Sequence, residues 1–282
     1  MLGMVLEGGA MRGMFTTGVL DVMMEQKLRV DGLMGVSAGA VFGCNYKSGQ
    51  IGRVLRYNTR YCRDWRYASF RSLLLTGDLY GAKFCYWDLP MELDKMDYEA
   101  YAANPHPFYV VCTDVETGEA VYKLCPRADG EYRDWFRASA SMPLVSRVVE
   151  ADGRKLLDGG IADSIPIRYF ESIGYGRNVV ILTQPEGFVK TPSRGLPLLK
   201  CMLRRYPKVA QAMMRRHEVY NETSAYITRR EQEGAAFVIR PPKALELSRT
   251  EHDPVRLASA YHTGREEALR RLVELKAFLA NE

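Results

Sequence analysis

Two short apolar segments, each followed by a glycine-containing turn and a helical pattern, open the chain and restrict its fold most strongly. Residues 4–6 lead into "EGGAMRG", and residues 33–36 lead directly to Ser37. The apolar face of the first helical pattern comprises Phe15, Val19, Val22 and Met23. Strand–helix–strand units of this kind build parallel sheets that helices cover. The opening of the sequence therefore predicts an α/β fold with a parallel sheet.

Ser37 is the central residue of "GVSAG", a G-x-S-x-G pattern. In a nucleophile elbow the serine occupies a sharp strand-to-helix turn, where glycine neighbours avoid collisions that a Cβ atom would cause. Gly35 and Gly39 have this spacing, and the helix expected after Ser37 directs its N-terminus at the serine, which favours negative charge there. We therefore interpret Ser37 as a nucleophile. The alternative is a small residue in a tight loop.

An acyl-transfer serine needs backbone donors for the oxyanion of its tetrahedral intermediate. In a parallel sheet, the loop after the first predicted strand lies beside the Ser37 strand, and N–H groups at a helix start are free to donate. The candidate oxyanion residues are Gly8, Gly9, Ala10, Met11, Arg12 and Gly13. A dinucleotide-binding loop is the competing interpretation, but Ala10 occupies the place of the central glycine of G-x-G-x-x-G, and the sequence contains no G-K-[ST].

A nucleophilic serine also needs a base, and the sequence contains only 4 histidines. His106 lies in a proline-rich loop, and the others, in the C-terminal third, are His217, His252 and His262. Asp158 is the better candidate because it ends an apolar strand, after a predicted Asp152-Gly153 hairpin, and precedes Gly159 and Gly160. A turn-forming Asp-Gly is the alternative interpretation. Burial of this carboxyl would raise its pKa and make it a stronger base at neutral pH.

Three motifs, "EGGAMRG", "GVSAG" and "LLDGG", resemble in this order those of the patatin-like phospholipase family. "VVCTDVETGEA" and "RASASMPLVS" are also similar to segments of that family, so the resemblance covers residues 4 to about 170. It implies a three-layer α/β/α sandwich with a mostly parallel central sheet. It also implies hydrolysis of fatty acyl esters by a Ser-Asp dyad without a metal or cofactor. By this correspondence Ser37 is the nucleophile, Asp158 the general base, and residues 8–13 the oxyanion loop.

Ala10 departs from the third glycine that is usual in the family, and alanine resists a positive φ. We expect residues 1–190 to form the catalytic domain and residues 191–282 to form a mainly helical extension packed on it. This extension has helical patterns over residues 207–233 and 254–280 with the strand-like "AAFVIRP" between them. It is similar to the tail of some bacterial members of the family.

The 6 cysteines lie far apart and form no C-x-x-C pair, which is typical of reduced thiols in a cytosolic protein. The start of the sequence lacks the basic and apolar regions of a secretory signal. The longest uncharged stretch is also too short for a helix that spans a bilayer. These features predict a cytoplasmic location.

The net charge of +5 is unevenly distributed along the chain. Residues 47–71 contain seven basic residues and one acidic residue, and residues 190–230 contain ten basic and two acidic residues. Four arginines recur at helical spacing with aromatic residues between them: Arg53, Arg56, Arg60 and Arg63. This pattern predicts peripheral contact with an anionic membrane at the inner face. An ordinary surface helix is the alternative, and no nucleic-acid partner is expected, because no fold signature accompanies the basic residues.

The function predicted from these residues is lipid acyl hydrolysis, of the phospholipase A or lysophospholipase type, through a covalent acyl-enzyme. We expect Met11, Met14 and Met142 to line the acyl site because methionine suits irregular apolar cavities, although ordinary core packing is the alternative. Two other classes remain open. One is a catalytically silent lipid-binding protein, and the other is a nucleotide-binding protein that uses residues 8–13 for phosphate.

Overall fold

A central β-sheet organises the computed structural model, which describes residues 1–192 and 203–280. Within these residues the sheet is 8-stranded, with the order β5-β6-β3-β2-β1-β7-β8 and with β4 paired to β3. The parallel strands are β1 (Leu2–Leu6), β2 (Gly32–Val36), β3 (Phe108–Asp114), β7 (Arg177–Ile181) and β8 (Ala236–Ile239). The antiparallel strands at one side are β4 (Ala120–Leu124), β5 (Val149–Ala151) and β6 (Arg154–Asp158). The sheet is thus mostly parallel, as predicted.

The central strands are buried on both faces. Met4 and Leu6 of β1 pack in one hydrophobic cluster, whereas Val5 between them packs in another. All residues of β2 are buried. Nearly continuous apolar strands of this kind are typical of parallel sheets covered by helices on both sides, which is why the pattern in the first 36 residues predicted the fold.

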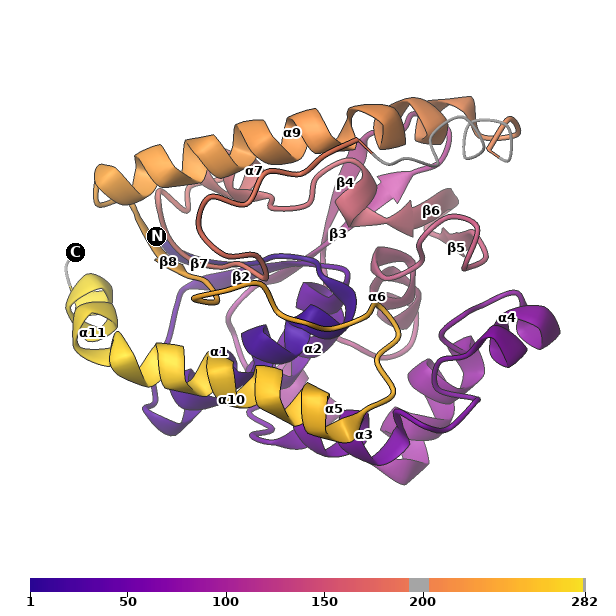
Figure 1. The fold of residues 1–282 in the computed structure, drawn as a ribbon, viewed down its shortest axis with the longest axis horizontal. Coiled ribbons are helices and arrows are strands. Elements are labelled where there is room, and N and C mark those ends of the chain that lie inside the picture. Colours follow the sequence, from indigo (N-terminus) through magenta and orange to yellow (C-terminus); the bar gives the residue numbers. More distant parts are fainter. Residues whose placement is uncertain (193–202, 281–282) are drawn as a thin grey trace.

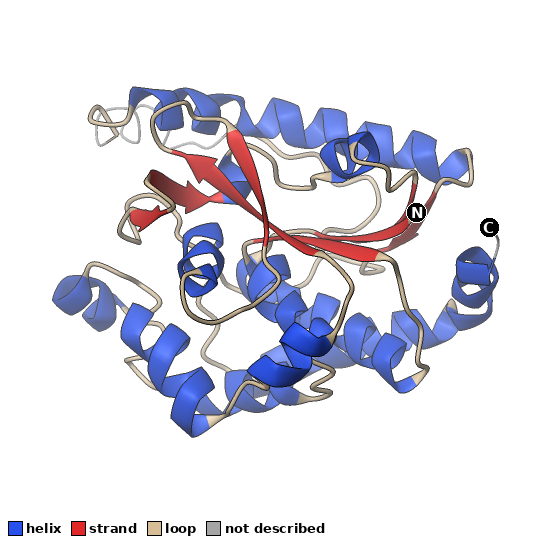
Figure 2. Ribbon diagram, turned by 180° about the vertical axis from the view of Figure 1, so that it is seen from behind, coloured by secondary structure: helices blue, strands red, loops and turns tan. Residues whose placement is uncertain are grey.

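Helices cover both faces of the sheet (Figures 1 and 2). On one face lie α7 (Ile167–Ser172) and α9 (Pro207–Gln232), whose buried side chains pack against Val5, Met34 and Val111. The other face is covered by α1 (Gly13–Glu25), α2 (Ala38–Lys47), α6 (Tyr132–Ser139), α10 (Pro254–Arg270) and α11 (Leu272–Ala280). The predicted three-layer α/β/α sandwich with a C-terminal helical region is confirmed.

The C-terminal segment contributes to all three layers. β8 extends the sheet beside β7, α9 forms much of one outer layer, and α10 packs on α1 in the other (Figure 1). The backbones of α1 and α10 almost touch, because a Cβ atom at Gly18 would lie 2.0 Å from the Tyr261 carbonyl oxygen and one at Gly264 would lie 2.0 Å from that of Phe15. The described C-terminal residues, 203–280, are therefore built into the sheet as well as packed on it.

The prediction of one continuous helix over residues 254–280 is wrong. Two helices, α10 and α11, occupy these residues, and they are separated at Arg271. The guanidinium of Arg271 donates a hydrogen bond to the Val238 carbonyl of β8 and pairs with Glu274. The contact of Arg271 with β8 accompanies the break between the helices. The spacing of apolar residues along the sequence does not indicate this contact.

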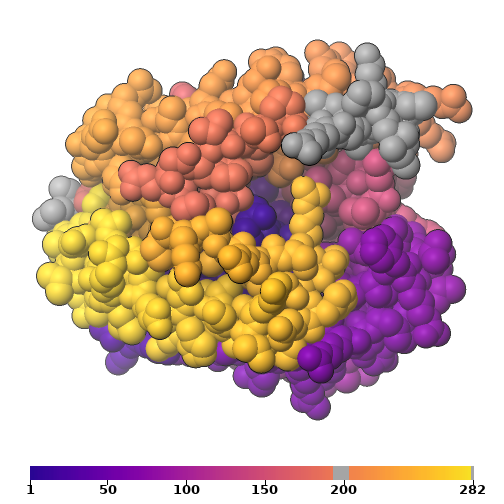
Figure 3. Space-filling model, in the orientation of Figure 1, coloured from indigo at the N-terminus to yellow at the C-terminus, as the bar shows by residue number. Residues whose placement is uncertain are grey.

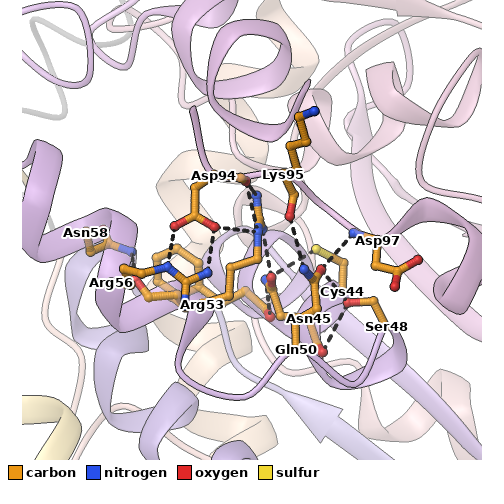
Figure 4. A network of polar contacts seen from close by, with 12 residues as sticks. Cys44, Asn45, Ser48, Gln50, Arg53, Arg56, Asn58, Asp94, Lys95 and Asp97 are labelled. Atoms are coloured by element: carbon orange, nitrogen blue, oxygen red, sulfur yellow. Dashed lines mark hydrogen bonds and ion pairs between the residues drawn. The ribbon is translucent and has the colours of Figure 1, made fainter. Parts of the chain in front are cut away.

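Smaller helices build a lobe beside the main layers: α3 (Arg53–Tyr61), α4 (Phe70–Thr76), a π-helical segment (Phe84–Leu93) and α5 (Tyr98–Ala103). The expected stripe of four exposed arginines on the first of these is wrong. Arg53 is only 4% exposed and pairs with Asp94, which also binds Arg56 through two hydrogen bonds of 2.7 Å (Figure 4). Arg63 lies beyond the end of α3. Of these four arginines, only Arg60 and Arg63 are exposed without a carboxylate partner among the described residues.

The thiols of Cys44, Cys62, Cys85, Cys112 and Cys125 are free. Cys201 lies outside the described residues. Across residues 1–192 and 203–280, no helix combines the length and the apolar character that crossing a membrane requires.

Candidate active site

Ser37 occupies the turn between β2 and α2 in a backbone conformation that few residues other than glycine adopt. Its φ is +54° and its ψ is −122°. A Cβ atom at Gly39 would lie 2.4 Å from the Leu6 carbonyl oxygen, and one at Gly35 would lie 2.6 Å from that of Gly39. Only glycine fits at either position. The turn therefore stores strain at Ser37 and presents its hydroxyl at the edge of the sheet where the parallel strands end.

Asp158 faces Ser37 across this edge. It is the last residue of β6, which runs antiparallel to β3 and pairs Asp158 with Cys112. The Ser37 Oγ donates a hydrogen bond of 2.7 Å to Asp158 Oδ2, and the Gly160 N–H donates one of 2.8 Å to Oδ1. The predicted Asp152-Gly153 hairpin, which has positive φ at both residues, sets the register of β6. Two residues 121 positions apart in the chain are thus joined directly.

The environment of Asp158 favours its neutral form. The residue is 2% exposed, and burial raises the pKa of its carboxyl above the ordinary value. The hydrogen bond from Ser37 and the positive charge of Arg216 act in the opposite direction and stabilise the carboxylate. A carboxyl with a raised pKa is a better proton acceptor at neutral pH than an ordinary aspartate.

The glycine loop predicted to hold an oxyanion lies against Ser37. A Cβ atom at Gly8 would lie 3.0 Å from the Ser37 Cβ, and one at Gly9 would lie 2.6 Å from Thr183 Oγ1. The loop then enters a short 3₁₀ turn, Ala10–Arg12, which continues into α1 at Gly13. N–H groups in the first turn of a helix have no intrahelical acceptor. This loop, in which Gly8 approaches Ser37, and the start of α2 therefore bring backbone N–H groups near Ser37.

Ala10 adopts a φ of +49°, the left-handed region that alanine resists. The loop thus keeps the geometry of a glycine although the side chain is a methyl group. This arrangement carries strain close to Ser37.

Ser139 is part of the site, although sequence reasoning did not single it out. Its Oγ accepts a hydrogen bond of 2.9 Å from the Ser37 N–H and donates one of 2.6 Å to the Val111 carbonyl. The N–H of Ser37 is therefore engaged in holding the turn. Ser139 is completely buried at the end of α6, in the segment "RASASMPLVS", where no spacing distinguishes it from its serine and alanine neighbours.

An apolar cavity of about 150 Å³ opens on one side of Ser37. Met11 and Met142 line it, as predicted, together with aromatic and aliphatic side chains that include Phe42, Tyr57 and Leu79. Met14 does not. It is fully buried in the core beneath, so the expectation for this residue is wrong.

A second cavity, of about 220 Å³, opens on the other side of Ser37. It shares Ala10, Ser37, Met142 and Asp158 with the apolar cavity. Its lining also includes four cationic side chains, Arg12, Lys190, Arg216 and Arg249, of which Arg249 lines the apolar cavity as well. Arg216 comes from α9 and donates a hydrogen bond to the Gly160 carbonyl beside Asp158. Sequence reasoning noted a basic stretch at residues 190–230 but did not place it at the site.

None of the four histidines lines either cavity. The Nδ1 of His252 lies near the Cys62 carbonyl, and the backbone of His106 accepts a hydrogen bond from Lys47. The polar group that contacts the Ser37 hydroxyl is a carboxylate.

Comparison with known proteins identifies two regions of the chain. Residues 4–171 match the model of a family described as patatin-like phospholipase, and residues 206–280 match a domain of unknown function, DUF6363. An Escherichia coli K12 protein, described as uncharacterized protein YjjU, is 28% identical over 253 residues, which are 86% of this chain and 69% of that protein. Lysophospholipase NTE1 of Saccharomyces cerevisiae is 26% identical over 184 residues, 61% of this chain but only 10% of that enzyme. Among solved structures, VipD from Legionella pneumophila aligns with a TM-score of 0.47 at 13% identity, over 96% of this chain and 66% of VipD.

Proposed function

Because this chain belongs to the patatin-like phospholipase family, we propose that it is a serine hydrolase of lipid acyl esters whose catalytic dyad is Ser37 and Asp158. Family membership and similarity to a lysophospholipase support lipid hydrolysis in general. The observation that carries the specific assignment is the hydrogen bond of 2.7 Å from the strained Ser37 hydroxyl to the buried Asp158 carboxylate.

The proposed reaction begins when Ser37 Oγ attacks the ester carbonyl carbon while Asp158 Oδ2 accepts its proton. The collapse of the tetrahedral intermediate breaks the bond to the leaving alcohol, and Asp158 returns the proton to that oxygen. Water, activated by the same carboxylate, then hydrolyses the acyl-enzyme. The contacts of Asp158 with Ser37 and Gly160 hold the base in position, a role that a third residue has in a triad.

Backbone N–H groups of residues 8–11 and of Ala38, the first residue of α2, are proposed to bind the oxyanion. The N–H groups of Arg12 and Gly13 already donate to the carbonyls of Gly9 and Ala10. The Ser37 N–H is excluded from this role because it donates to Ser139. The apolar cavity is proposed to receive the acyl chain. With a volume of about 150 Å³ it resembles cavities that hold one benzene molecule, so a long chain has to extend beyond it.

We also propose a cytoplasmic location with peripheral contact to an anionic membrane. Because Arg53 and Arg56 pair with Asp94, we base the membrane contact on a different surface, the one around α4. In α4, Phe70 is 76% and Leu74 is 86% exposed, and the nearby Arg71 lies 4.4 Å from the ring of Trp65. Exposed apolar side chains, an amphipathic aromatic ring and unpaired arginines, which include Arg60 and Arg63, match a bilayer surface with anionic headgroups.

The position of α4 connects this surface to the acyl cavity. The ends of its loop are joined by a bridge between Ala68 and Tyr80, and α4 lies at the periphery of the molecule (Figure 1). Leu79 and Tyr80, directly after this loop, line the cavity. We therefore propose that a lipid that leaves the bilayer at α4 enters the apolar cavity beside Leu79 and Tyr80.

Hydrolysis of a soluble short-chain ester tests the assignment without the complication of an interface. Ser37→Ala is expected to lose activity almost completely, and Asp158→Asn is expected to lose at least about 100-fold, a typical cost of removing a general base. Circular dichroism must show that both variants fold. If Ser37→Ala keeps a rate near that of the parent, another group performs the hydrolysis and the Ser37 proposal fails. If the parent itself hydrolyses no ester, lipid binding without catalysis or nucleotide binding becomes the better interpretation.

A further inference from the structure

The polar cavity beside Ser37 holds more positive than negative charge. Arg12, Lys190, Arg216 and Arg249 line it. In residues 1–192 and 203–280, none of these four side chains forms an ion pair with a carboxylate. The Nε of Arg12 is buried without a hydrogen-bond partner, and the Nζ of Lys190 lies 3.8 Å from the centre of the Tyr220 ring.

The two nearest carboxylates are already engaged. Glu7 accepts hydrogen bonds from the Thr183 N–H and from the Tyr220 hydroxyl at 2.9 Å, and Asp158 accepts from Ser37 and Gly160. Neither carboxylate forms an ion pair with the cationic cluster. Arg249 is exposed, whereas Arg12, Lys190 and Arg216 are half-buried. Removing unpaired charges from water is unfavourable, so the free protein bears a cost at these three residues that a bound anion would relieve.

The titration of Lys190 reflects this imbalance. Burial, together with the positive charges of Arg216, Arg12 and Arg249, lowers the pKa of Lys190 to about 7, although the charge of Glu7 opposes the effect. Burial likewise lowers the pKa of Arg216. The charge of Asp158 opposes this second shift, and the positive charges of Arg249 and Arg12 add to it.

The two cavities meet at Ser37 and Asp158 and differ in chemistry. An ester has an acyl part and an alcohol part on opposite sides of the bond that breaks. When the acyl chain fills the apolar cavity, the alcohol part extends into the cationic one. In an acyl ester of a phosphorylated glycerol, the phosphate lies a few bonds from the ester oxygen, and arginine and lysine side chains are well suited to bind it.

We propose that Lys190, Arg216 and Arg249, with Arg12, form a binding site for the phosphate of the substrate's leaving group, so that the substrate class is phosphate-bearing acyl esters rather than neutral glycerides. This inference rests on the proposed function, because it assigns the alcohol side of the same ester. Arg249 lines both cavities and lies at their junction.

The site also gives the C-terminal region a role in the reaction. Arg216 on α9 and Arg249 before α10 fall within the domain of unknown function, residues 206–280, and Lys190 follows β7. None of the three belongs to the part that matches the patatin-like model, residues 4–171. The hollow in Figure 3 shows this arrangement, with indigo atoms of the N-terminal part at its bottom and orange and yellow segments around it.

A pair of soluble esters with the same hexanoyl chain, one on glycerol 3-phosphate and one on glycerol, tests the specificity. The parent enzyme is expected to prefer the phosphorylated ester in kcat/KM. Lys190→Gln and Arg249→Gln should each reduce that preference by about 10- to 100-fold, the usual worth of a hydrogen bond to a charged group. Arg215→Gln is the matched control. Arg215 neighbours Arg216 on α9 but faces Glu218, and the preference should stay unchanged.

Binding to the Ser37→Ala protein tests the site without turnover. Calorimetry is expected to show that glycerol 3-phosphate binds, that glycerol does not, and that Lys190→Gln with Arg249→Gln weakens binding at least about tenfold. If the parent hydrolyses both esters equally and glycerol 3-phosphate does not bind, the phosphate site is refuted and the hydrolase proposal stands. If glycerol 3-phosphate binds but neither ester is hydrolysed, the site stands and the hydrolase proposal fails.

Inorganic phosphate is the third probe, because free phosphate and a lipid headgroup share their chemistry. Binding of inorganic phosphate as tightly as glycerol 3-phosphate, combined with no preference between the two esters, would show a site for the free anion and overturn the headgroup assignment.

Discussion

Strain at single residues surrounds the proposed nucleophile. Ser37 and Ala10 both have a positive φ, and both lie where the proposed reaction places the carbonyl group of the ester. Such conformations persist only when neighbouring structure enforces them, and they cluster at functional sites. Here the enforcing contacts are the close approaches of Gly35 and Gly39 to carbonyl oxygens and the hydrogen bond from the Ser37 N–H to Ser139.

Replacement of Ala10 by glycine should stabilise the protein. A left-handed conformation costs alanine about 1–2 kcal/mol, which glycine avoids, whereas the greater freedom of glycine in the unfolded chain returns part of this gain. We expect a net gain of about 0.5–1 kcal/mol, measured as the midpoint of urea unfolding. Lys27→Gly is the matched control, because Lys27 is exposed, has a φ of +55° and lies outside the site. A loss of stability in Ala10→Gly alone would contradict the strain at Ala10.

The charge of Asp158 should also limit stability. Its pKa is raised in the folded protein, so the folded state binds this proton more tightly than the unfolded state does. The free energy of unfolding therefore falls as the pH rises from the ordinary aspartate pKa through the raised one. Asparagine carries no such charge. The melting temperature of Asp158→Asn, relative to the parent, should increase between pH 4 and pH 7. A relative melting temperature that falls over this interval would mean that the carboxylate is stabilised rather than destabilised by its surroundings.

At the scale of elements, the sequence predicted strands and turns that depend on neighbouring residues, but not contacts between distant parts of the chain. Short apolar segments predicted β1, β2 and the hairpin before Asp158, and the glycine spacing located the turn at Ser37. The cationic cavity was not predicted, because Lys190, Arg216 and Arg249 come from three separate parts of the chain. The arginine stripe was misread for a similar reason. Helical spacing placed Arg53 on a surface, but Asp94, 41 residues further along the chain, covers it.

The exposed face of α4 yields a test of membrane contact. Leu74→Asp with Leu75→Asp should reduce sedimentation of the protein with anionic vesicles several-fold, because two apolar side chains can no longer enter the interface and two negative charges face the lipid headgroups. Hydrolysis of a soluble short-chain ester should change little. Val273→Asp, which alters an equally exposed residue on α11, serves as the control. Unchanged vesicle binding in the α4 variant would assign the contact to another surface.

At the scale of the whole molecule, the C-terminal segment is joined to the catalytic layers at several places. β8 completes the sheet, α9 covers one face, and α10 meets α1 at Gly18 and Gly264. Sequence patterns predicted most of the helices of this segment. They did not predict how closely α10 approaches α1, because this contact depends on two glycines that are 246 residues apart in the chain. The positions of Arg216 and Arg249 depend on this docking.

Gly264→Ala tests how far the catalytic layers depend on α10. The added Cβ would lie 2.0 Å from a backbone oxygen of α1, so the helices have to separate, and overpacking of this kind costs about 1–3 kcal/mol or more. The midpoint of urea unfolding should fall accordingly. Gly176→Ala, where an added Cβ has no atom within 4 Å, should leave the midpoint nearly unchanged. Equal midpoints for both variants would show that α10 docks loosely.

Covalent labelling by a fluorophosphonate, followed by mass spectrometry of the intact protein and its peptides, tests the central claim most directly. An activated serine displaces fluoride and keeps the phosphonyl group. The account predicts one adduct, on Ser37, which is absent in Ser37→Ala. In Asp158→Asn the adduct should form at least about 100-fold more slowly. When any of the four histidines is replaced by alanine, the labelling rate should stay within about tenfold of the parent rate. Labelling that persists in Ser37→Ala, or that His106→Ala abolishes as completely while the protein stays folded, would contradict the Ser37–Asp158 dyad.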